Sequence, residues 1–253
     1  MVTNNIDGTQ TAIVNVDITG LWTTPDSPRP IDAPLLADQP DHPRWLADMD
    51  GRETLEEGRL GLYDRFDSEL LHGEPVIVTS GDTDGWTQVT SPWQPYDGSA
   101  TGYPGYVRTA HLQPVESGSP ETLPAGGDAA TVDRFLAEAR THIGLAYLWG
   151  GISPAGLDCS GLVHYSLRRL GVLFPRDAGD QSRACEIVPI EQARPGDLYF
   201  FAHAGQPIHH VGIVTGPGRI LHSPSTGADV VEEDMPAERL ETLTQVGRIN
   251  QLQ

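Results

Sequence analysis

The chain has 253 residues, and its 35 acidic residues outnumber its 16 basic residues, all of them arginine, for a formal net charge of −19. Phosphate backbones and anionic membrane surfaces are bound through clusters of Lys and Arg, so this composition argues against nucleic acid or a membrane as a partner. The sequence has no run of about 18 apolar residues, the length that predicts a transmembrane helix. Its two cysteines are too few for a disulfide framework.

The first residues, Met1–Asp7, have neither the basic region nor the apolar stretch of a secretory signal. We therefore expect the protein to act in the cytoplasm. A secreted protein whose signal has been removed is the alternative.

The first half of the chain reads as a small β domain. Thr11–Asp17 alternates as a strand does, and the Pro- and Asp-rich segment Leu21–Arg59 predicts an extended insertion loop. Further strands, separated by Gly/Asp turns, are predicted at Gly61–Phe66, Pro75–Thr79, Trp86–Val89 and Gly105–Arg108. Short strands at close spacing predict a small β-barrel over residues 1–115.

A Pro/Gly/Ser-rich segment, residues 116–128, predicts a linker before a second domain at 129–253. Helical periodicity follows at Thr131–Ile143 and Cys159–Leu170, with Gly171 as the expected C-terminal cap. The later strands are predicted at Leu198–Ala202, His210–Thr215, Arg219–Ser223 and Gln245–Ile249. Helices followed by an antiparallel sheet predict an α+β domain.

Cys159 falls where the second of these helices begins. The positive end of the helix dipole would stabilise a thiolate and lower the thiol pKa, which favours a nucleophile. A buried structural thiol is the alternative. The polar, small flanks Asp158 and Ser160, and the glycine turn that ends Tyr147–Gly151, weaken that alternative.

A thiolate needs a base, and the base needs an orienting partner. If Thr215–Arg219 is a five-residue hairpin loop, Val214 pairs with Ile220, and His210 and His222 share one face of the sheet. The two rings are then close enough for a hydrogen bond. A four-residue loop would break this parity.

Metal binding is the competing use of the histidines and the second cysteine. None of these residues shows ligand spacing such as HExxH or CxxC, so we expect no metal and no cofactor. The residues concerned are His203, His209, His210, His222 and Cys185.

Six motifs in the second half, in this order, resemble those of the NlpC family of cell-wall cysteine peptidases. They are Tyr147-Leu-Trp-Gly-Gly151, Asp158-Cys-Ser-Gly161, Pro175-Arg-Asp-Ala178, Arg194-Pro-Gly-Asp-Leu198, His210-Val-Gly-Ile213 and Leu221-His222. The resemblance implies a papain-like α+β fold, in which a helix bearing the cysteine packs on an antiparallel sheet bearing the histidine.

The resemblance also implies the roles of individual residues. Cys159 would be the nucleophile, His210 the general base, and His222 the third polar residue that orients His210. Tyr147 would help to stabilise the oxyanion. Two further residues would contact the substrate backbone: Asp158 and Ser160.

The first half resembles the bacterial SH3-like domain that is fused to one branch of this family, through Val76–Thr79, Gly85-Trp86 and Gly102-Tyr-Pro-Gly-Tyr106. In that branch a Tyr and a Glu of the SH3-like domain and an Asp of the catalytic domain hold the free amine of an N-terminal L-Ala. The residues that match by motif are Tyr103, Glu74 and Asp177. Ala178 stands where the pattern carries serine, which puts one hydrogen bond to the substrate in question.

The branch contains γ-D-glutamyl-L-diamino acid endopeptidases that act on muropeptide fragments. The resemblance therefore implies a cysteine hydrolase that recycles stem-peptide fragments of the form L-Ala-γ-D-Glu-diamino acid. Three alternatives stay open: a secreted hydrolase of intact wall, a non-catalytic wall-binding module, and an acyltransferase that uses the same Cys–His pair.

Overall fold

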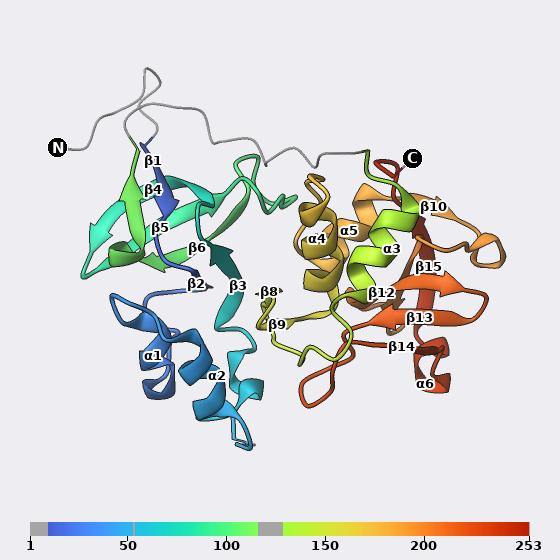
Figure 1. Cartoon of the computed structure of the whole chain (residues 1–253), viewed down its shortest axis with the longest axis horizontal. Helices are drawn as coiled ribbons and strands as arrows, with labels where there is room; N and C mark the ends of the chain where they lie inside the picture. The colour runs from blue at the N-terminus through green and yellow to red at the C-terminus, as the bar shows by residue number, and fades with distance from the viewer. Residues whose placement is uncertain (1–9, 53, 116–128, 253) are drawn as a thin grey trace. The chain divides into compact units, whose positions relative to one another are not determined.

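The computed structural model describes residues 10–52, 54–115 and 129–252 (Figure 1). By its internal contacts the chain divides into two units, one of Met1–Thr122 with Leu148–Ala155, and one of Leu123–Tyr147 with Gly156–Gln253. The predicted linker, residues 116–128, lies outside the described residues. The return of Leu148–Ala155 to the first unit was not part of the two-domain prediction.

The first unit is built on a seven-stranded antiparallel sheet with the strand order β3-β2-β6-β5-β4-β1-β7. The strands of this sheet are β1 (Gln10–Val14), β2 (Ile18–Trp22), β3 (Phe66–Leu71), β4 (Pro75–Thr83), β5 (Trp86–Ser91), β6 (Tyr103–Arg108) and β7 (Leu112–Pro114). The short helix η3 (Thr109–His111) precedes β7, and the returning segment contains a further short strand, β8 (Ile152–Ser153). The turn Asp84-Gly85 joins β4 to β5 with positive φ angles of 53° and 80°, as a tight hairpin requires. The antiparallel β architecture is thus confirmed, whereas closure into an SH3-like barrel stays a prediction.

The segment Leu21–Arg59 is not the extended loop that its composition predicted. It contains β2 and then η1 (Pro30–Asp32), α1 (Ala33–Leu36) and α2 (His42–Met49), with η2 (Arg59–Leu62) at its end. Asp41 caps α2 by accepting the N–H of Arg44 at 3.0 Å, and a proline occupies its first turn. Asp before a helix and Pro in the first turn start helices, so the residues that suggested a loop are capping residues here.

The helices of this segment bury their apolar faces in a cluster of their own. Its fully buried members are Trp22, Leu35, Trp45, Met49, Leu62, Phe66 and Leu148. The strand predicted at Gly61–Phe66 is wrong. Gly61 and Leu62 are the last residues of η2, and of this stretch only Phe66 belongs to a strand, β3. The cluster is separate from the core of the sheet, which consists of Ala12, Val14, Val16, Leu21, Leu70, Val76, Val89 and Val107.

A buried ion pair lies within this helical segment. Asp32 accepts hydrogen bonds from Nε and Nη2 of Arg29, both at 2.9 Å, and from Nε1 of Trp45 at 2.8 Å. Arg29 and Asp32 are almost completely inaccessible to solvent. Each charge is therefore tolerated only because the other is present.

The returning segment Leu148–Ala155 is held to the first unit by a buried carboxylate. Glu69 on β3 accepts the N–H of Ile152 at 2.9 Å through Oε2, and its Oε1 lies 2.7 Å from Nε2 of His42. Gly150 has a φ of +77°, and a Cβ there would lie 2.5 Å from the Phe66 ring. Both the backbone conformation and the close approach require glycine.

The second unit is a six-stranded antiparallel sheet with the order β10-β15-β11-β12-β13-β14 (Figure 1). Its strands are β10 (Glu186–Val188), β11 (Leu198–Ala202), β12 (Ile208–Gly216), β13 (Arg219–His222), β14 (Val231–Asp234) and β15 (Leu243–Arg248), with the short β9 (Gly156–Leu157). Its helices are α3 (Val132–Arg140), α4 (Cys159–Arg169), α5 (Ala178–Ala184), α6 (Ala237–Leu240) and the short η4 (Ile190–Gln192). α4 packs against β12 and α3, which confirms the predicted α+β arrangement.

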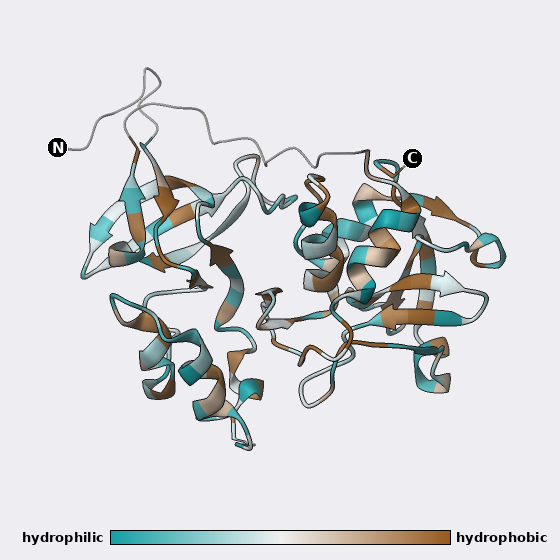
Figure 2. Cartoon of the chain, in the orientation of Figure 1, coloured by the Kyte–Doolittle hydropathy of each residue, from teal (hydrophilic) through white to brown (hydrophobic). Residues whose placement is uncertain are grey.

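Local sequence explains the ends of the two long helices. Thr131 caps α3 by accepting the N–H of Arg134 at 3.3 Å. Asp158 caps α4, and Gly171 follows that helix with a φ of +78°, as predicted. The strands at the centre of the sheet are largely hydrophobic (Figure 2), and β11 is buried along its whole length. No helix among the described residues is both long and apolar enough to cross a membrane.

The Arg29–Asp32 pair leads to a stability prediction. Replacing Asp32 by Ala leaves the Arg29 guanidinium buried without its counter-charge, and we expect this to lower the free energy of unfolding by about 3–5 kcal/mol. Urea denaturation followed by tryptophan fluorescence measures it, because all five tryptophans belong to the first unit.

The matched control is Asp48→Ala, which breaks the exposed Arg44–Asp48 pair on α2. Exposed i, i+4 pairs contribute about 0.5 kcal/mol or less, so this variant should unfold almost as the parent does. Equal losses in the two variants would show that burial does not give the Arg29 pair its importance.

Candidate functional site

The candidate nucleophile Cys159 is the first residue of α4 and is 9% exposed. Asp158 caps the helix by accepting the N–H of Gly161 at 2.6 Å through Oδ1. The cysteine sulfur accepts the backbone N–H groups of Val211 on β12 and of Ser160. The thiol therefore lies against the strand that carries His210, the residue before Val211.

Burial, and not the helix terminus, decides the protonation state of this thiol. Burial above all, together with the negative charge of Asp158, raises the pKa of Cys159 to about 12. The Val211 N–H, the Arg176 guanidinium and the Ser160 N–H act in the opposite direction but are outweighed. The lowered pKa predicted from the helix position is therefore wrong for the free protein, whose thiol is neutral at neutral pH.

The two candidate histidines meet as the predicted strand register requires. Val214 pairs with Ile220, and Nε2 of His210 lies 2.9 Å from Nδ1 of His222, with the ring planes at 74°. Gly212 makes room for this contact. A Cβ at that position would lie 2.4 Å from the Ile220 side chain and 3.1 Å from Cβ of His222.

A carboxylate that the sequence reasoning missed extends this pair. Nε2 of His222 lies 3.0 Å from Oε1 of Glu233 on β14. A carboxylate can only accept, so His222 carries its proton on Nε2 and accepts the Nε2–H of His210 on Nδ1. The Nδ1 of His210 then keeps its lone pair and is the atom able to take a thiol proton.

Both histidines are held in the neutral form. Burial lowers the pKa of His210 well below 6.5, and the positive charge of Arg239 and the proximity of His222 lower it further. Burial also lowers the pKa of His222, while the hydrogen bond to Glu233 raises it. The resting site therefore consists of a neutral thiol and a neutral imidazole.

The sequence does hold a signal for Glu233. It is the middle residue of an acidic triplet on β14, and its two neighbours pair with surface arginines. Glu232 binds Arg140 at 2.8 Å, and Asp234 binds Arg219 at 2.7 Å. Because successive strand residues face opposite sides, the middle carboxylate points the other way, toward His222.

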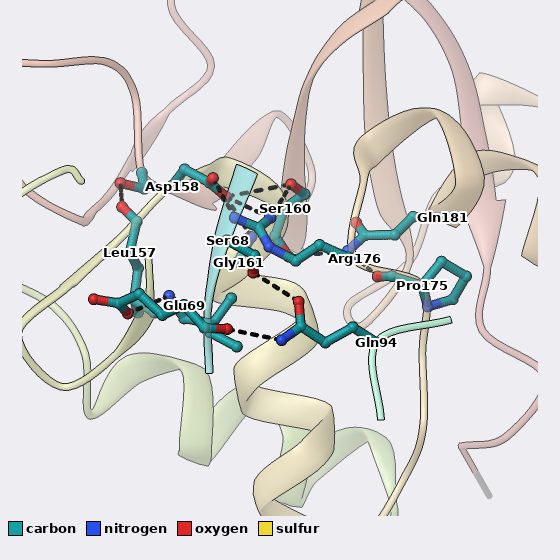
Figure 3. A network of polar contacts seen from close by, with 12 residues as sticks. Ser68, Glu69, Gln94, Leu157, Asp158, Ser160, Gly161, Pro175, Arg176 and Gln181 are labelled. Carbon is teal, nitrogen blue, oxygen red and sulfur yellow. Dashed lines mark hydrogen bonds and ion pairs between the residues drawn. The ribbon is translucent and has the colours of Figure 1, made fainter. Parts of the chain in front are cut away.

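Asp158 and Ser160 are brought together by a buried arginine (Figure 3). Nη2 of Arg176 lies 2.6 Å from Oδ2 of Asp158, and its Nη1 donates to Oγ of Ser160 at 2.9 Å. Arg176 is 1% exposed. The two side chains predicted to contact substrate are thus engaged within the protein, where they fix the first turn of α4. The motif Pro175-Arg-Asp-Ala178 alone did not indicate this role for Arg176.

A glutamine completes this support. Nε2 of Gln181 on α5 donates to the carbonyls of Ser160 and Pro175, both at 2.9 Å (Figure 3). These two hydrogen bonds connect the first turn of α4 to the residues that lead into α5. These residues include Asp177, which is half-buried and stands at the N-cap position of α5.

Tyr147, the candidate oxyanion residue, lies beside the approach to the cysteine. It forms a β-bridge with Leu157, two residues before Cys159, and its N–H donates to the carbonyl of Ala228 at 2.9 Å. Its side chain is buried. The structure therefore brings Tyr147 close to the start of α4, as its predicted role requires.

Tyr103 and Glu74 are neighbours in the first unit. Ser91 faces Tyr103 in the β5–β6 register, and its hydroxyl donates to Oε1 of Glu74 at 2.7 Å. Gln94 also donates to Oε1 of Glu74, at 2.9 Å, and the N–H of Leu71 donates to Oε2 at 3.1 Å. With its carboxylate buried and already hydrogen-bonded to these donors, Glu74 is the predicted amine ligand whose surroundings fit that role least.

The residues considered for a metal do not gather. Within residues 10–52, 54–115 and 129–252, no group of three or more His, Cys, Asp or Glu side chains is arranged to hold an ion. His203 and His209 stack on each other with centroids 4.8 Å apart, and Cys185 is a half-buried free thiol.

The raised thiol pKa gives a direct prediction. A pKa of about 12 means that the thiolate fraction of Cys159 is small at neutral pH and grows as the pH rises. Its alkylation by iodoacetamide should therefore increase about tenfold per pH unit from about pH 7 to pH 10, because only the thiolate reacts. Peptide mass mapping measures Cys159 separately from Cys185, and the shape of the curve is the readout because access limits the absolute rate. A plateau below about pH 8 would instead mark a preformed thiolate.

Comparison with known proteins gives the family. Residues 144–246 match the NlpC/P60 family. The gamma-D-glutamyl-L-lysine dipeptidyl-peptidase of Bacillus subtilis (strain 168) is 31% identical over 84% of this chain and 90% of that protein. A protein of the same name from Bacillus cereus is 28% identical over 84% of this chain and 83% of that protein.

A solved structure agrees with these matches. The crystal structure of an NlpC/P60 family protein from Bacillus cereus ATCC 10987 is similar to this chain with a TM-score of 0.82 at 25% identity, over 94% of this chain and 99% of that chain. The similarity thus extends over nearly the whole length of both chains. The chain belongs to the NlpC/P60 family, and it is a cysteine peptidase.

Proposed function

We propose that this peptidase hydrolyses the bond between the γ-carbonyl of D-Glu and the amine of a diamino acid in peptidoglycan stem-peptide fragments. The observation that carries the chemistry is the chain of contacts from Glu233 through His222 to His210, next to the strand position that holds the Cys159 sulfur. The substrate class is supported by relatives named gamma-D-glutamyl-L-lysine dipeptidyl-peptidase, which match over most of both chains.

In the proposed reaction, proton transfer accompanies attack. With the thiol pKa near 12 and the imidazole pKa below 6.5, a thiolate–imidazolium pair is not populated at rest. Nδ1 of His210 takes the thiol proton as the sulfur bonds to the γ-carbonyl carbon. The positive charge that develops on His210 is stabilised through His222 by the carboxylate of Glu233.

The remaining steps follow from the same atoms. The backbone N–H of Cys159 at the start of α4 and the hydroxyl of Tyr147 are the proposed donors to the oxyanion. His210 then gives its proton to the leaving amine, and the acyl-enzyme is hydrolysed by a water molecule that His210 deprotonates. The products are L-Ala-γ-D-Glu and the free diamino acid.

We also propose that the substrate must have a free N-terminal L-Ala, held by Tyr103, Glu74 and Asp177. The neighbouring positions of Tyr103 and Glu74 support this within the first unit. Two carboxylates select an ammonium group, which only fragments released from the wall present. The enzyme would then act in muropeptide recycling, with the first unit as an SH3-like domain. The predicted cytoplasmic location stays a prediction.

Digestion of defined peptides tests the proposal. L-Ala-γ-D-Glu-meso-diaminopimelate and its L-Lys analogue are incubated with the enzyme, and the products are identified by mass spectrometry. We expect L-Ala-γ-D-Glu to appear, and N-acetylation of L-Ala to lower kcat/KM by about 100-fold or more, because the proposed carboxylate ligands of the amine lose their charged partner.

The controls use the two cysteines. Cys159→Ala should abolish product formation, whereas Cys185→Ala should cleave as the parent does. If acetylated and free peptides were cleaved with equal kcat/KM, amine recognition would be ruled out while the peptidase chemistry would stand. Cleavage by Cys159→Ala would overturn the assigned nucleophile.

The position of Glu233 gives a second prediction. Glu233→Gln removes the charge that, through His222, stabilises protonated His210, so kcat should fall by about tenfold with little change in KM. The acid limb of the kcat/KM profile should lie below pH 6.5 in the parent, because the pKa of His210 is lowered. Glu232→Gln is the matched control, since that neighbour binds Arg140 on the opposite face. Equal kinetics of the two variants would exclude a role for Glu233.

A further inference from the structure

Arg239 is a cation that has no carboxylate partner among the residues that the structure describes, although the protein is strongly acidic. It lies on α6, between β14 and β15, and is half-buried. Nη2 donates to the carbonyl of Pro224 at 3.0 Å, and the guanidinium lies over the Phe201 ring, 5.9 Å from its centroid. Among the described residues no Asp or Glu lies within ion-pair distance of Arg239.

The two anchors of Arg239 lie close to the two site histidines. Phe201 faces His210 in the β11–β12 register, and their ring centroids are 5.4 Å apart. Pro224 follows His222 by two residues. The guanidinium is thus fixed near the imidazole that must protonate the leaving amine.

The described groups near Arg239 include three histidines, and no described carboxylate lies within ion-pair distance of it. Its charge lowers the pKa of His209, His210 and His222, which is consistent with its proximity to all three rings. The acids adjacent on its own segment, Glu238 and Glu241, are exposed and do not pair with it. Glu233 lies beyond His222, to which it is bonded.

Six other arginines of this unit are neutralised. Ion pairs at 4.0 Å or less join Arg140 to Glu232, Arg169 to Glu138, Arg176 to Asp158, Arg183 to Asp180, Arg219 to Asp234 and Arg248 to Asp197. A cation left unpaired beside the base opposes the imidazolium that catalysis requires. Its position is therefore unfavourable to the reaction unless the substrate supplies the missing negative charge.

We propose that Arg239 binds a carboxylate of the residue on the leaving side of the scissile bond and so determines specificity at that position. This inference rests on the proposed function. The amine that His210 protonates belongs to that residue, so the residue must lie next to His210 and within reach of Arg239. A planar guanidinium matches a carboxylate with two parallel hydrogen bonds.

Binding of the carboxylate has a second consequence. Once the charge of Arg239 is neutralised, the repulsion that it exerts on a protonated His210 is reduced. The base is therefore better able to hold the thiol proton when a suitable substrate is present. Specificity and proton transfer are coupled through one guanidinium.

Two carboxylates of the diamino acid could be the ligand, and four peptides distinguish them. L-Ala-γ-D-Glu-L-Lys and L-Ala-γ-D-Glu-meso-diaminopimelate are each prepared with a free α-carboxylate and as the α-carboxamide of the last residue. The Lys amide then has no carboxylate on the leaving residue, and the diaminopimelate α-amide has only the one on its side chain.

The variants are Arg239→Gln, Arg239→Lys and, as the control with the same charge change, Arg194→Gln. Arg194 is exposed, precedes β11 and has no ion-pair partner among the described residues. We expect Arg239→Gln to lower kcat/KM by about 10- to 100-fold, mainly through KM, on the peptides that carry the recognised carboxylate. The Lys amide should be cleaved by Arg239→Gln at least as well as by the parent, because it has no carboxylate for Arg239 to bind and the variant lacks the charge that opposes protonation of His210.

The other outcomes each decide the question. Arg239→Lys should retain part of the preference, and Arg194→Gln all of it. A loss by the same factor on all four peptides in Arg239→Gln would show a structural role and overturn the inference alone. If the parent enzyme cleaved none of the four peptides, the proposed function would fail, and this inference with it.

Discussion

The pairing of β12 with β13 is the constraint on which the site depends. Side chains alternate along a strand, so a slip of one residue would turn His222 away from His210 and break their 2.9 Å contact. Gly212 has no side chain that would collide with Ile220 and His222 on this face of the sheet. The same strand offers the Val211 N–H to the Cys159 sulfur, and β14 continues the sheet to bring in Glu233. Nucleophile, base and both orienting groups thus depend on one antiparallel register.

Burial is the second physical theme of the site. It outweighs the helix terminus at Cys159 and keeps both partners of the proton transfer uncharged at rest. A neutral pair avoids the cost of holding two ions in a desolvated pocket, and charge develops only as bonds change. Three charged side chains lie near the Cys159–His210 pair. Arg176 is neutralised by Asp158, and Glu233 is bonded to His222. Arg239 has no carboxylate within ion-pair distance among the described residues.

The sequence predicted those features that local patterns encode. The start of α4 at Cys159 follows from its Asp cap. The pairing of Val214 with Ile220, which brings His210 and His222 together, was also predicted, but the loop is shorter than the five residues assumed: Gly216 pairs with Arg219, and a register shift between Val214 and Gly216 restores the parity. Contacts between residues far apart in the chain, such as Arg176 with Asp158, were not accessible, because no periodicity links them. The helices within Leu21–Arg59 were missed for another reason. Pro and Asp favour both loops and helix starts, and only packing against Trp22 and Phe66 decides between them.

The return of Leu148–Ala155 to the first unit limits how such proteins can be divided. The chain passes between the units after Thr122, after Tyr147 and after Ala155, so no single cut separates two intact pieces. A gene truncated at the linker would encode a catalytic unit whose eight residues just before β9 have lost Glu69 and the Phe66 ring. Recombination that exchanges the first unit between relatives would have to exchange this short segment with it to keep these contacts.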